Sequence, residues 1–265
     1  MLRTAVALLL ALAACRPRAN PIDVLQSGTW IDLSYSFDST TIYWPTAQPF
    51  RLEVVSAQRT AAGFYYAANN LSAAEHGGTH LDAPIHFAKG KWTTDQIPLD
   101  RLIGPAVVVD VSAAVTQTGA DYLVAARDFM DWEAAHGPLP AGAIVLVRTG
   151  WGARWPDRAR YLGTTKTGQE AVAELHFPGI APEAARWLLG RQVHAVGIDT
   201  PSLDYGRSKT FETHVSLLGE NVPGLENLAN LDRLPATGAF VLALSMKIGG
   251  GSGGPLRIVA WIPNP

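Results

Sequence analysis

The sequence is almost without cysteine, since Cys15 is the only one among 265 residues. An intramolecular disulfide and a thiolate zinc site are therefore excluded, and no cysteine nucleophile can lie in the main body of the chain. Any metal would have to be held by the seven histidines and by carboxylates. Runs of like charge are also missing: 21 basic and 23 acidic residues give a net charge of −2, which argues against a nucleic-acid partner.

The chain has no apolar run long enough to cross roughly 30 Å of hydrocarbon. The short apolar run at 4–12 follows Arg3 and precedes Ala13-Ala14-Cys15, an order typical of a bacterial export signal. Because 12–15 (LAAC) also matches a lipobox, we expect residues 1–20 to be a lipoprotein-type signal peptide and tether. Cys15 would then anchor an exported, periplasmic protein to a bacterial membrane. The alternative is a plain secretory signal in which Cys15 has no role.

The composition and the apolar pattern favour one globular domain. Hydrophobic residues make up 48% and charged residues 17% of the chain, which argues against disorder and coiled coil. Apolar runs predict strands at 52–55, 64–70, 105–111, 143–148, 194–198, 240–246 and 256–262. Helices are predicted over 128–136, before Gly137-Pro138, and over 182–189. Strands interleaved with helices, without a break in composition, predict a single α/β domain over 21–265.

Four residues that could bind a metal lie close together in the sequence: His76, His80, Asp82 and His86. Their common parity would place them on one face of an extended chain. A helix is disfavoured because Gly77-Gly78 weakens it and Pro84 restricts the residue before it. An ideal strand, however, would spread residues 76–86 over roughly 33 Å. We therefore predict that Gly77-Gly78 turns the chain and brings His76 back beside the other ligands.

The residue types in this stretch point to a catalytic metal. Imidazole and carboxylate groups without thiolate suit Zn, Mn, Fe or Ni. Two histidines and one aspartate leave coordination positions for water, as catalytic sites do. A lone histidine is usually a core or surface residue, but this combination beside two glycines predicts a metal or hydrolytic site.

Residues 76–87 (HGGTHLDAPIHF) resemble the HxGTHxDxPxHF signature of the metal-dependent cyclase family. That family includes bacterial kynurenine formamidase (arylformamidase) and isatin hydrolase. The resemblance extends through most of 28–262 and includes the segments 31–34, 43–45, 197–202 and 247–257. It implies an α/β domain with a mixed, barrel-like β-sheet flanked by helices, and assembly as a homo-oligomer.

The resemblance also implies roles for single residues. One divalent ion, Zn or Mn, would be held by His76, His80 and Asp82. Asp82 can bridge to a second ion held with His214 and Glu226, which lie twelve residues apart. In a site with one ion, His214 and Glu226 would instead orient water. His86 matches the family's proton-transfer residue. The remaining histidines match no site position and are interpreted as structural: His136, His176 and His194.

The activity that follows from the resemblance is hydrolysis of an aryl amide C–N bond. A metal-activated water would attack, and His86 would act as proton shuttle. The implied substrates are isatin, giving isatinate, and N-formylkynurenine of tryptophan catabolism, giving kynurenine and formate. The alternative is a non-catalytic metal- or ligand-binding exported lipoprotein of the same fold. Intact His86 argues against it, because a pure metal binder needs no proton shuttle.

Two further patterns remain to be interpreted. Residues 249–254 (GGGSGG) fit both GxGxxG and GxSxG. A β-like segment follows where a dinucleotide site needs a helix, and no Asp or His follows Ser252, as an α/β-hydrolase would require. We therefore predict a tight loop between the last two strands. The resemblance suggests the alternative that the backbone N–H groups of this loop line the substrate pocket. The aromatic residues of 43–45 and Trp92 are either core residues or walls for an aromatic substrate.

Overall fold

The computed structural model describes residues 20–264. The expected signal segment, with Cys15, lies outside the described residues. Within 20–264, no helix combines the length and the apolar character that a membrane span needs.

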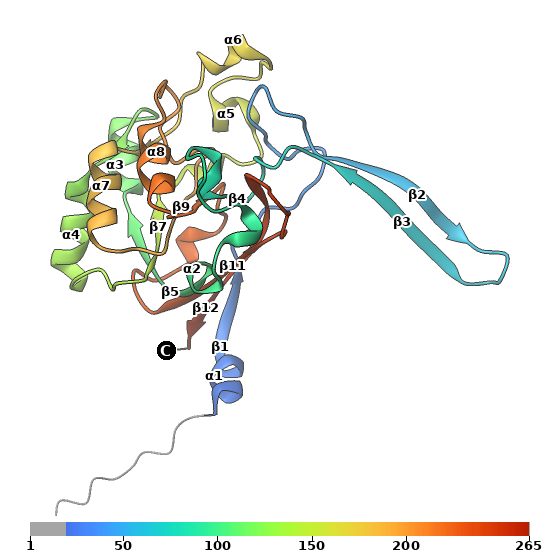
Figure 1. Cartoon of the computed structure of the whole chain (residues 1–265), viewed down its shortest axis with the longest axis horizontal. Helices are drawn as coiled ribbons and strands as arrows, with labels where there is room; N and C mark the ends of the chain where they lie inside the picture. Colours follow the sequence, from blue (N-terminus) through green and yellow to red (C-terminus); the bar gives the residue numbers. More distant parts are fainter. Residues whose placement is uncertain (1–19, 265) are drawn as a thin grey trace, which may run out of the picture.

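The centre of the fold is a mixed β-sheet that closes into a barrel (Figure 1). Within residues 20–264 the strands follow the order β12-β11-β5-β7-β9-β10-β4, β4 pairs back to β12, and β1 pairs with the far end of β12. The run β5-β7-β9-β10 is parallel and the remaining pairs are antiparallel. The strands of this sheet are β1 (Gly28–Asp32), β4 (His80–Asp82), β5 (Ile103–Asp110), β7 (Ile144–Arg148), β9 (Ala195–Ile198), β10 (Gly224–Glu226), β11 (Ala239–Ser245) and β12 (Gly253–Pro263).

Helices cover one side of this barrel (Figure 1). The helices on this side are α3 (Ser112–Thr118), α4 (Ala126–His136), α7 (Pro182–Gly190) and α8 (Glu212–Gly219). The other helices are α1 (Pro21–Ser27), α2 (Leu99–Leu102), α5 (Arg158–Leu162) and α6 (Gln169–Val172), with 3-10 turns η1 (Pro84–His86), η2 (Thr94–Gln96), η3 (Trp151–Arg154) and η4 (Leu231–Arg233). Both predicted helices are confirmed: α4 ends before Gly137, and α7 begins at Pro182.

The parallel strands are buried on both faces, which explains their continuous apolar runs. In β5, Val107 and Val109 pack into a cluster with α4 and α7, whereas Val108 packs into the barrel interior. The interior cluster also takes Leu81 of β4 and Leu225 of β10. The α/β class and the barrel-like sheet are therefore confirmed, and the strand that carries the candidate ligands is fixed by the packed interior.

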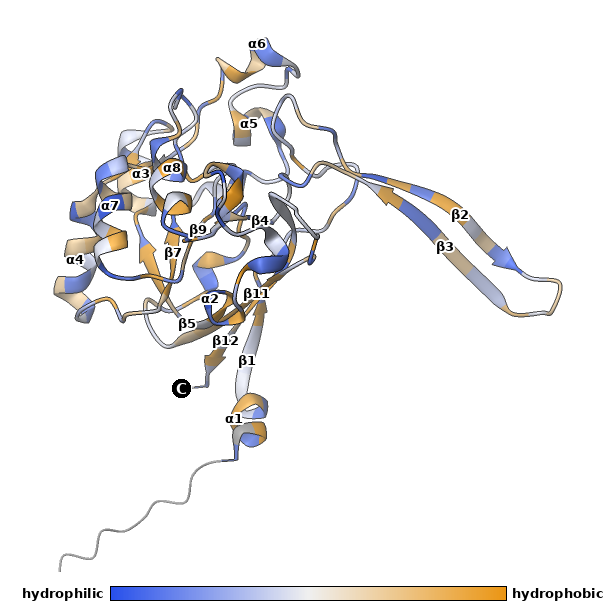
Figure 2. Ribbon diagram, in the orientation of Figure 1, coloured by the Kyte–Doolittle hydropathy of each residue, from blue (hydrophilic) through white to orange (hydrophobic). Residues whose placement is uncertain are grey.

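Two separate strand pairs complete the described part of the chain. β6 (Leu123–Val124) pairs with β8 (Gly179–Ile180). β2 (Arg51–Arg59) and β3 (Tyr65–Ser72) form a hairpin that extends away from the barrel (Figure 1). We call residues 51–72 the arm. Apolar and polar residues alternate irregularly along it (Figure 2), and most of its side chains are exposed.

Candidate metal centre

The candidate centre is built on β4, which lies between β10 and β12. Leu81 points into the barrel interior and is fully buried, so His80 and Asp82 share the opposite face. The antiparallel register places Glu226 of β10 directly opposite His80, and directly paired residues point to the same face. The pairing of two short strands thus brings together three ligand-type side chains.

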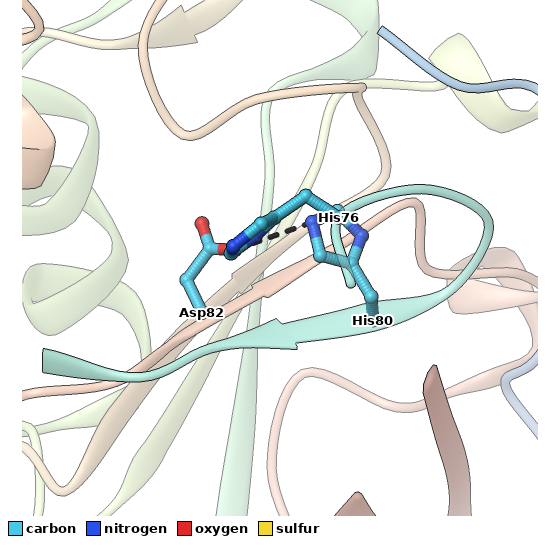
Figure 3. A group of neighbouring side chains, drawn as sticks. All are labelled: His76, His80 and Asp82. Atoms are coloured by element: carbon cyan, nitrogen blue, oxygen red, sulfur yellow. Dashed lines mark hydrogen bonds and ion pairs between the residues drawn. The ribbon is translucent and has the colours of Figure 1, made fainter. Parts of the chain in front are cut away.

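A glycine turn before β4 supplies His76. Gly78 has a φ of +58°, in the left-handed region that favours glycine. A Cβ there would lie 2.7 Å from the ring of Phe37. The turn brings His76 Nδ1 to 2.7 Å from Asp82 Oδ1, and Figure 3 shows the imidazole and carboxylate pointing toward one another. The predicted turn is present, but β4 ends at Asp82, and His86 lies instead on the 3-10 turn η1.

His214 reaches the Asp82 carboxylate from a different element, the helix α8. His214, on α8, has Nε2 at 3.1 Å from both Asp82 Oδ2 and Glu226 Oε1. On the other side, His80 Nε2 lies 3.2 Å from Asp82 Oδ1 and 3.4 Å from Glu226 Oε2. The Asp82 carboxylate therefore lies between two groups of ligand atoms. Each group is compact enough to hold one ion, and the groups are His76, His80 and Asp82, and Asp82, His214 and Glu226.

The buried carboxylates of Asp82 and Glu226 favour positive charge on the groups around them. Burial alone would raise the pKa of Asp82, but the charge of His76 and hydrogen bonds from the histidines lower it well below its usual range. Burial, and then the Asp82 charge, raise the pKa of Glu226. Burial opposes protonation of His80, yet the hydrogen bond and charge of Asp82 raise its pKa to about 9. Two buried carboxylates that draw protons onto imidazoles form a donor set that fits a divalent cation.

Hydrogen bonds from outside the cluster orient two of the histidines. His80 Nδ1 lies 3.0 Å from the carbonyl oxygen of Gly78, and His214 Nδ1 lies 2.6 Å from Asp204 Oδ2. In both cases the Nε2 atom faces the carboxylates, as metal-bound imidazoles supported by outer acceptors do. Asp204 also accepts the backbone N–H groups of Thr213 and His214 at 3.1 Å, so it holds the start of α8. Asp204 could not be identified from the sequence, because no spacing distinguishes it from other acidic residues.

A cavity of about 290 Å³ opens onto the cluster. It is lined by the candidate ligands and His86, and by an apolar wall of Ile42, Tyr43, Trp44, Ala47, Ala74, Phe87, Pro201 and Phe211. Tyr43 and Trp44 are thus cavity walls, whereas Trp92 packs against the barrel interior. The other three histidines do not line this cavity.

His86 lies beside the ligands without belonging to either ligand group. Its ring stacks on that of His76, with centroids 3.8 Å apart and an angle of 20° between the planes. Burial lowers the pKa of His86 to about 4; the charge of Asp82 opposes this shift, and the charges of His76, His214 and His80 add to it. The imidazole is therefore neutral near pH 7 and can accept a proton inside the cavity.

The fold and this site fit a metal-dependent hydrolase, and comparisons with known proteins show the family to which the chain belongs. The profile of the family described as "Putative cyclase" matches residues 31–205, and the chain belongs to that family. An isatin hydrolase of Roseibium aggregatum is 37% identical over 210 residues, which cover 76% of this chain and 77% of the relative. A kynurenine formamidase of Salinibacter ruber is 30% identical over 235 residues, which cover 86% and 95%.

A solved structure supports the same assignment. Isatin hydrolase A from Labrenzia aggregata, bound to benzyl benzoate, superposes with a TM-score of 0.81 at 35% identity, covering 90% of this chain and 95% of that one. The expected family and fold are therefore confirmed.

Proposed function

We propose that this protein hydrolyses the C–N bond of an aryl amide and that cyclic amides of the isatin type are its first candidate substrates. The observation that carries the proposal is an aromatic-walled cavity that ends on a buried histidine–carboxylate cluster. Its volume suits a small bicyclic ring. The isatin hydrolase relatives favour the cyclic amide over N-formylkynurenine, the second candidate.

The candidate ligands form two groups, each of which would bind one metal ion. His76, His80 and Asp82 would hold one ion, and Asp82, His214 and Glu226 a second. A divalent ion at these positions supplies Lewis acidity and lowers the pKa of water toward neutrality. The donor set suits Zn and Mn alike.

His86 moves the proton in the proposed reaction. As a water oxygen bonds to the amide carbonyl carbon, neutral His86 accepts the proton that the water gives up. When the C–N bond breaks, His86 delivers this proton to the departing aryl nitrogen. The apolar wall around Trp44 and Phe211 orients the ring and excludes bulk water.

The test is hydrolysis by purified protein stripped of metal, with isatin and N-formylkynurenine followed by absorbance and Zn²⁺ or Mn²⁺ added back. We expect metal-restored turnover, with isatin as the better substrate. Preference for N-formylkynurenine would move the protein to the formamidase type. Tight metal binding without turnover of any aryl amide would support the alternative of a non-catalytic metal-binding protein.

We also propose that the arm packs against a second copy of the chain, forming a homo-oligomer. Seven large apolar side chains of the arm are more than half exposed, namely Leu52, Val54, Val55, Phe64, Tyr65, Tyr66 and Leu71. Exposed apolar side chains gathered on one element mark an interaction site, and a standard interface takes roughly 800 Å² from each partner. An isolated two-stranded hairpin is marginally stable in water, so the arm needs such a covering. A second copy matches it in length and character, because a two-fold axis pairs the same surface with itself.

Light scattering after size exclusion tests the arm. Wild type is expected at twice the mass of one chain or more, and a Val54→Glu, Tyr65→Glu double variant at the mass of one chain. Met130→Glu, at an exposed apolar residue of α4, is the matched control and should leave the mass unchanged. A monomeric wild type would overturn the proposal.

Finally, we propose export with a lipid anchor at Cys15, on the sequence pattern alone. Fractionation of cells expressing the full chain tests this. Wild type is expected in the membrane fraction, and a Cys15→Ala variant is expected to be absent from that fraction. A soluble periplasmic wild type would favour the plain secretory signal.

A further inference from the structure

The two ring nitrogens of His76 face different partners. Nδ1 faces Asp82 inside the cluster, whereas Nε2 lies 2.9 Å from the hydroxyl oxygen of Ser252, in the loop between β11 and β12. Ser252 Oγ lies in turn 2.5 Å from Oε2 of Glu75, the residue before His76, and the Ser252 amide donates to the same oxygen at 3.1 Å. Ser252 and Glu75 are both half-buried. The glycine-rich loop and the histidine motif thus meet at one hydrogen-bonded chain.

The direction of these hydrogen bonds follows from their donors and acceptors. An ionised carboxylate only accepts, so the Ser252 hydroxyl donates its proton to Glu75. The hydroxyl oxygen can then accept from His76 only if Nε2 carries a hydrogen. Nδ1 faces the cluster and, with no ion between them, donates to Asp82 Oδ1. A metal ion bound there would take the place of that hydrogen and leave a neutral His76 with its hydrogen on Nε2.

We propose that Glu75 and Ser252 are positioning residues that fix the tautomer and ring orientation of His76, so that Nδ1 is the atom that binds metal. This inference rests on the proposed metal site. It completes a pattern in which each candidate histidine ligand has an outer acceptor: Gly78 for His80, Asp204 for His214, and the Ser252–Glu75 pair for His76.

The glycines of the loop allow it to approach this closely. A Cβ on Gly253 would lie 2.5 Å from Cε1 of His76, and one on Gly251 would lie 2.8 Å from Oε1 of Glu75. η2 holds the loop from the other side, because Asp95 accepts the Gly250 amide at 2.9 Å and Thr94 donates to the Gly251 carbonyl. The loop therefore has a structural reason for its glycines that involves neither a dinucleotide nor a nucleophile.

The alternative is that Ser252, His76 and Asp82 act as a serine-hydrolase triad, since their order in space fits one. Two observations argue against this alternative. The hydroxyl proton is directed to Glu75 and not to His76. Ser252 is also absent from the residues that line the cavity within the described chain.

The experiment measures metal affinity without substrate. Zn²⁺ and Mn²⁺ are titrated into metal-stripped wild type and into Ser252→Ala and Glu75→Gln variants, with a competing chelator. We expect the dissociation constant to rise about 10- to 100-fold in both variants, the usual effect of losing an outer partner. Ser252→Thr keeps the hydroxyl and should restore affinity. The matched controls are Ser27→Ala and Glu183→Gln, at exposed residues outside the site, and both should bind as wild type does.

A second readout separates positioning from a general loss of structure. The visible spectrum of the Co²⁺-loaded protein reports the ligand geometry, and we expect it to change in Ser252→Ala and to return in Ser252→Thr. Unchanged affinities and spectra in both variants would overturn the inference while leaving the metal site intact. Loss of turnover in Ser252→Ala at unchanged affinity would overturn it in favour of the triad. A wild type that binds neither metal would overturn the proposed metal site itself.

Discussion

At the scale of single residues, the site contains two kinds of histidine: those that contact the buried carboxylates, and one that is placed to transfer a proton. His80 and His214 contact the buried carboxylates, and their pKa values are raised. His86 stacks on the cluster without entering it, and its pKa is lowered. One motif therefore contains two environments with opposite effects on imidazole.

Replacing His86 tests this separation. His86→Asn is expected to bind Zn²⁺ or Mn²⁺ as wild type does and to lower kcat about 10²- to 10⁴-fold, the usual contribution of a proton-transfer group. Metal titration and turnover with the better amide substrate are measured together. His136→Asn, at an exposed histidine of α4, is the control and should keep both. A loss of metal affinity in His86→Asn would instead make His86 a ligand.

The turn before β4 gives a second test at this scale. Gly78→Ala is expected to lower the free energy of unfolding by about 2–4 kcal/mol, because it combines a left-handed φ with a contact to Phe37. Gly90 also has a positive φ, of +81°, but a Cβ there meets nothing within 4 Å. Gly90→Ala should therefore cost only about 1–2 kcal/mol. Urea unfolding measures both, and equal losses would show that the contact with Phe37 is unimportant.

At the scale of elements, the sequence predicts the strands better than it predicts the residues that hydrogen-bond to the candidate ligands and orient them. Val107, Val108 and Val109 form a continuous apolar run because both faces of β5 are buried, and such a run is visible without any structure. The support of His214 by Asp204 is not visible in the same way. It depends on where the loop after β9 passes α8, which no local periodicity specifies.

The contact between α4 and α7 provides a pH test. Glu133 on α4 accepts two hydrogen bonds of 2.9 Å from the Arg191 guanidinium, just after α7. These bonds hold the pKa of Glu133 below its usual value. A carboxyl whose pKa is lowered by folding stabilises the fold above its unfolded pKa, and this contribution is lost as pH falls through the folded value.

Glu133→Gln should therefore melt roughly one to three degrees below wild type at pH 7, a small difference because the pair is partly exposed. The difference should shrink as pH falls from about 5 to about 3. Asp131→Asn removes the partner of Arg127 on the same helix, where both side chains are exposed, and should change the melting temperature less. A difference between Glu133→Gln and wild type that is constant with pH would contradict the assignment.

At the scale of the whole molecule, the candidate ligands are far apart in the sequence and close only because the barrel closes. β4 pairs with both β10 and β12, so the strand of the motif is fixed by elements that follow it by more than 140 residues. The resemblance to a family signature pointed to His214 and Glu226, but neither residue stands out without it. Closure of the barrel and projection of the arm depend on long-range contacts, which local patterns do not specify.

This arrangement predicts that metal stabilises the molecule as a whole. An ion held between β4, β10 and α8 would bind the folded chain and not the unfolded one. At a free concentration about 1,000 times the dissociation constant, it should therefore add about 4 kcal/mol to the free energy of unfolding. For a domain of this size that is a rise of roughly 8–16 °C in melting temperature. Scanning calorimetry of metal-stripped protein, with and without added Zn²⁺ or Mn²⁺, measures the rise.

Asp82→Asn is the decisive variant for this prediction, because Asp82 faces all three histidines of the cluster. It should lose most of the metal-dependent rise, whereas Asp131→Asn, on the exposed face of α4, should keep all of it. The metal-free Asp82→Asn protein should also melt below metal-free wild type, since the imidazoles lose their central acceptor. An equal metal-dependent rise in melting temperature in wild type and Asp82→Asn would show that the stabilising ion binds outside this cluster.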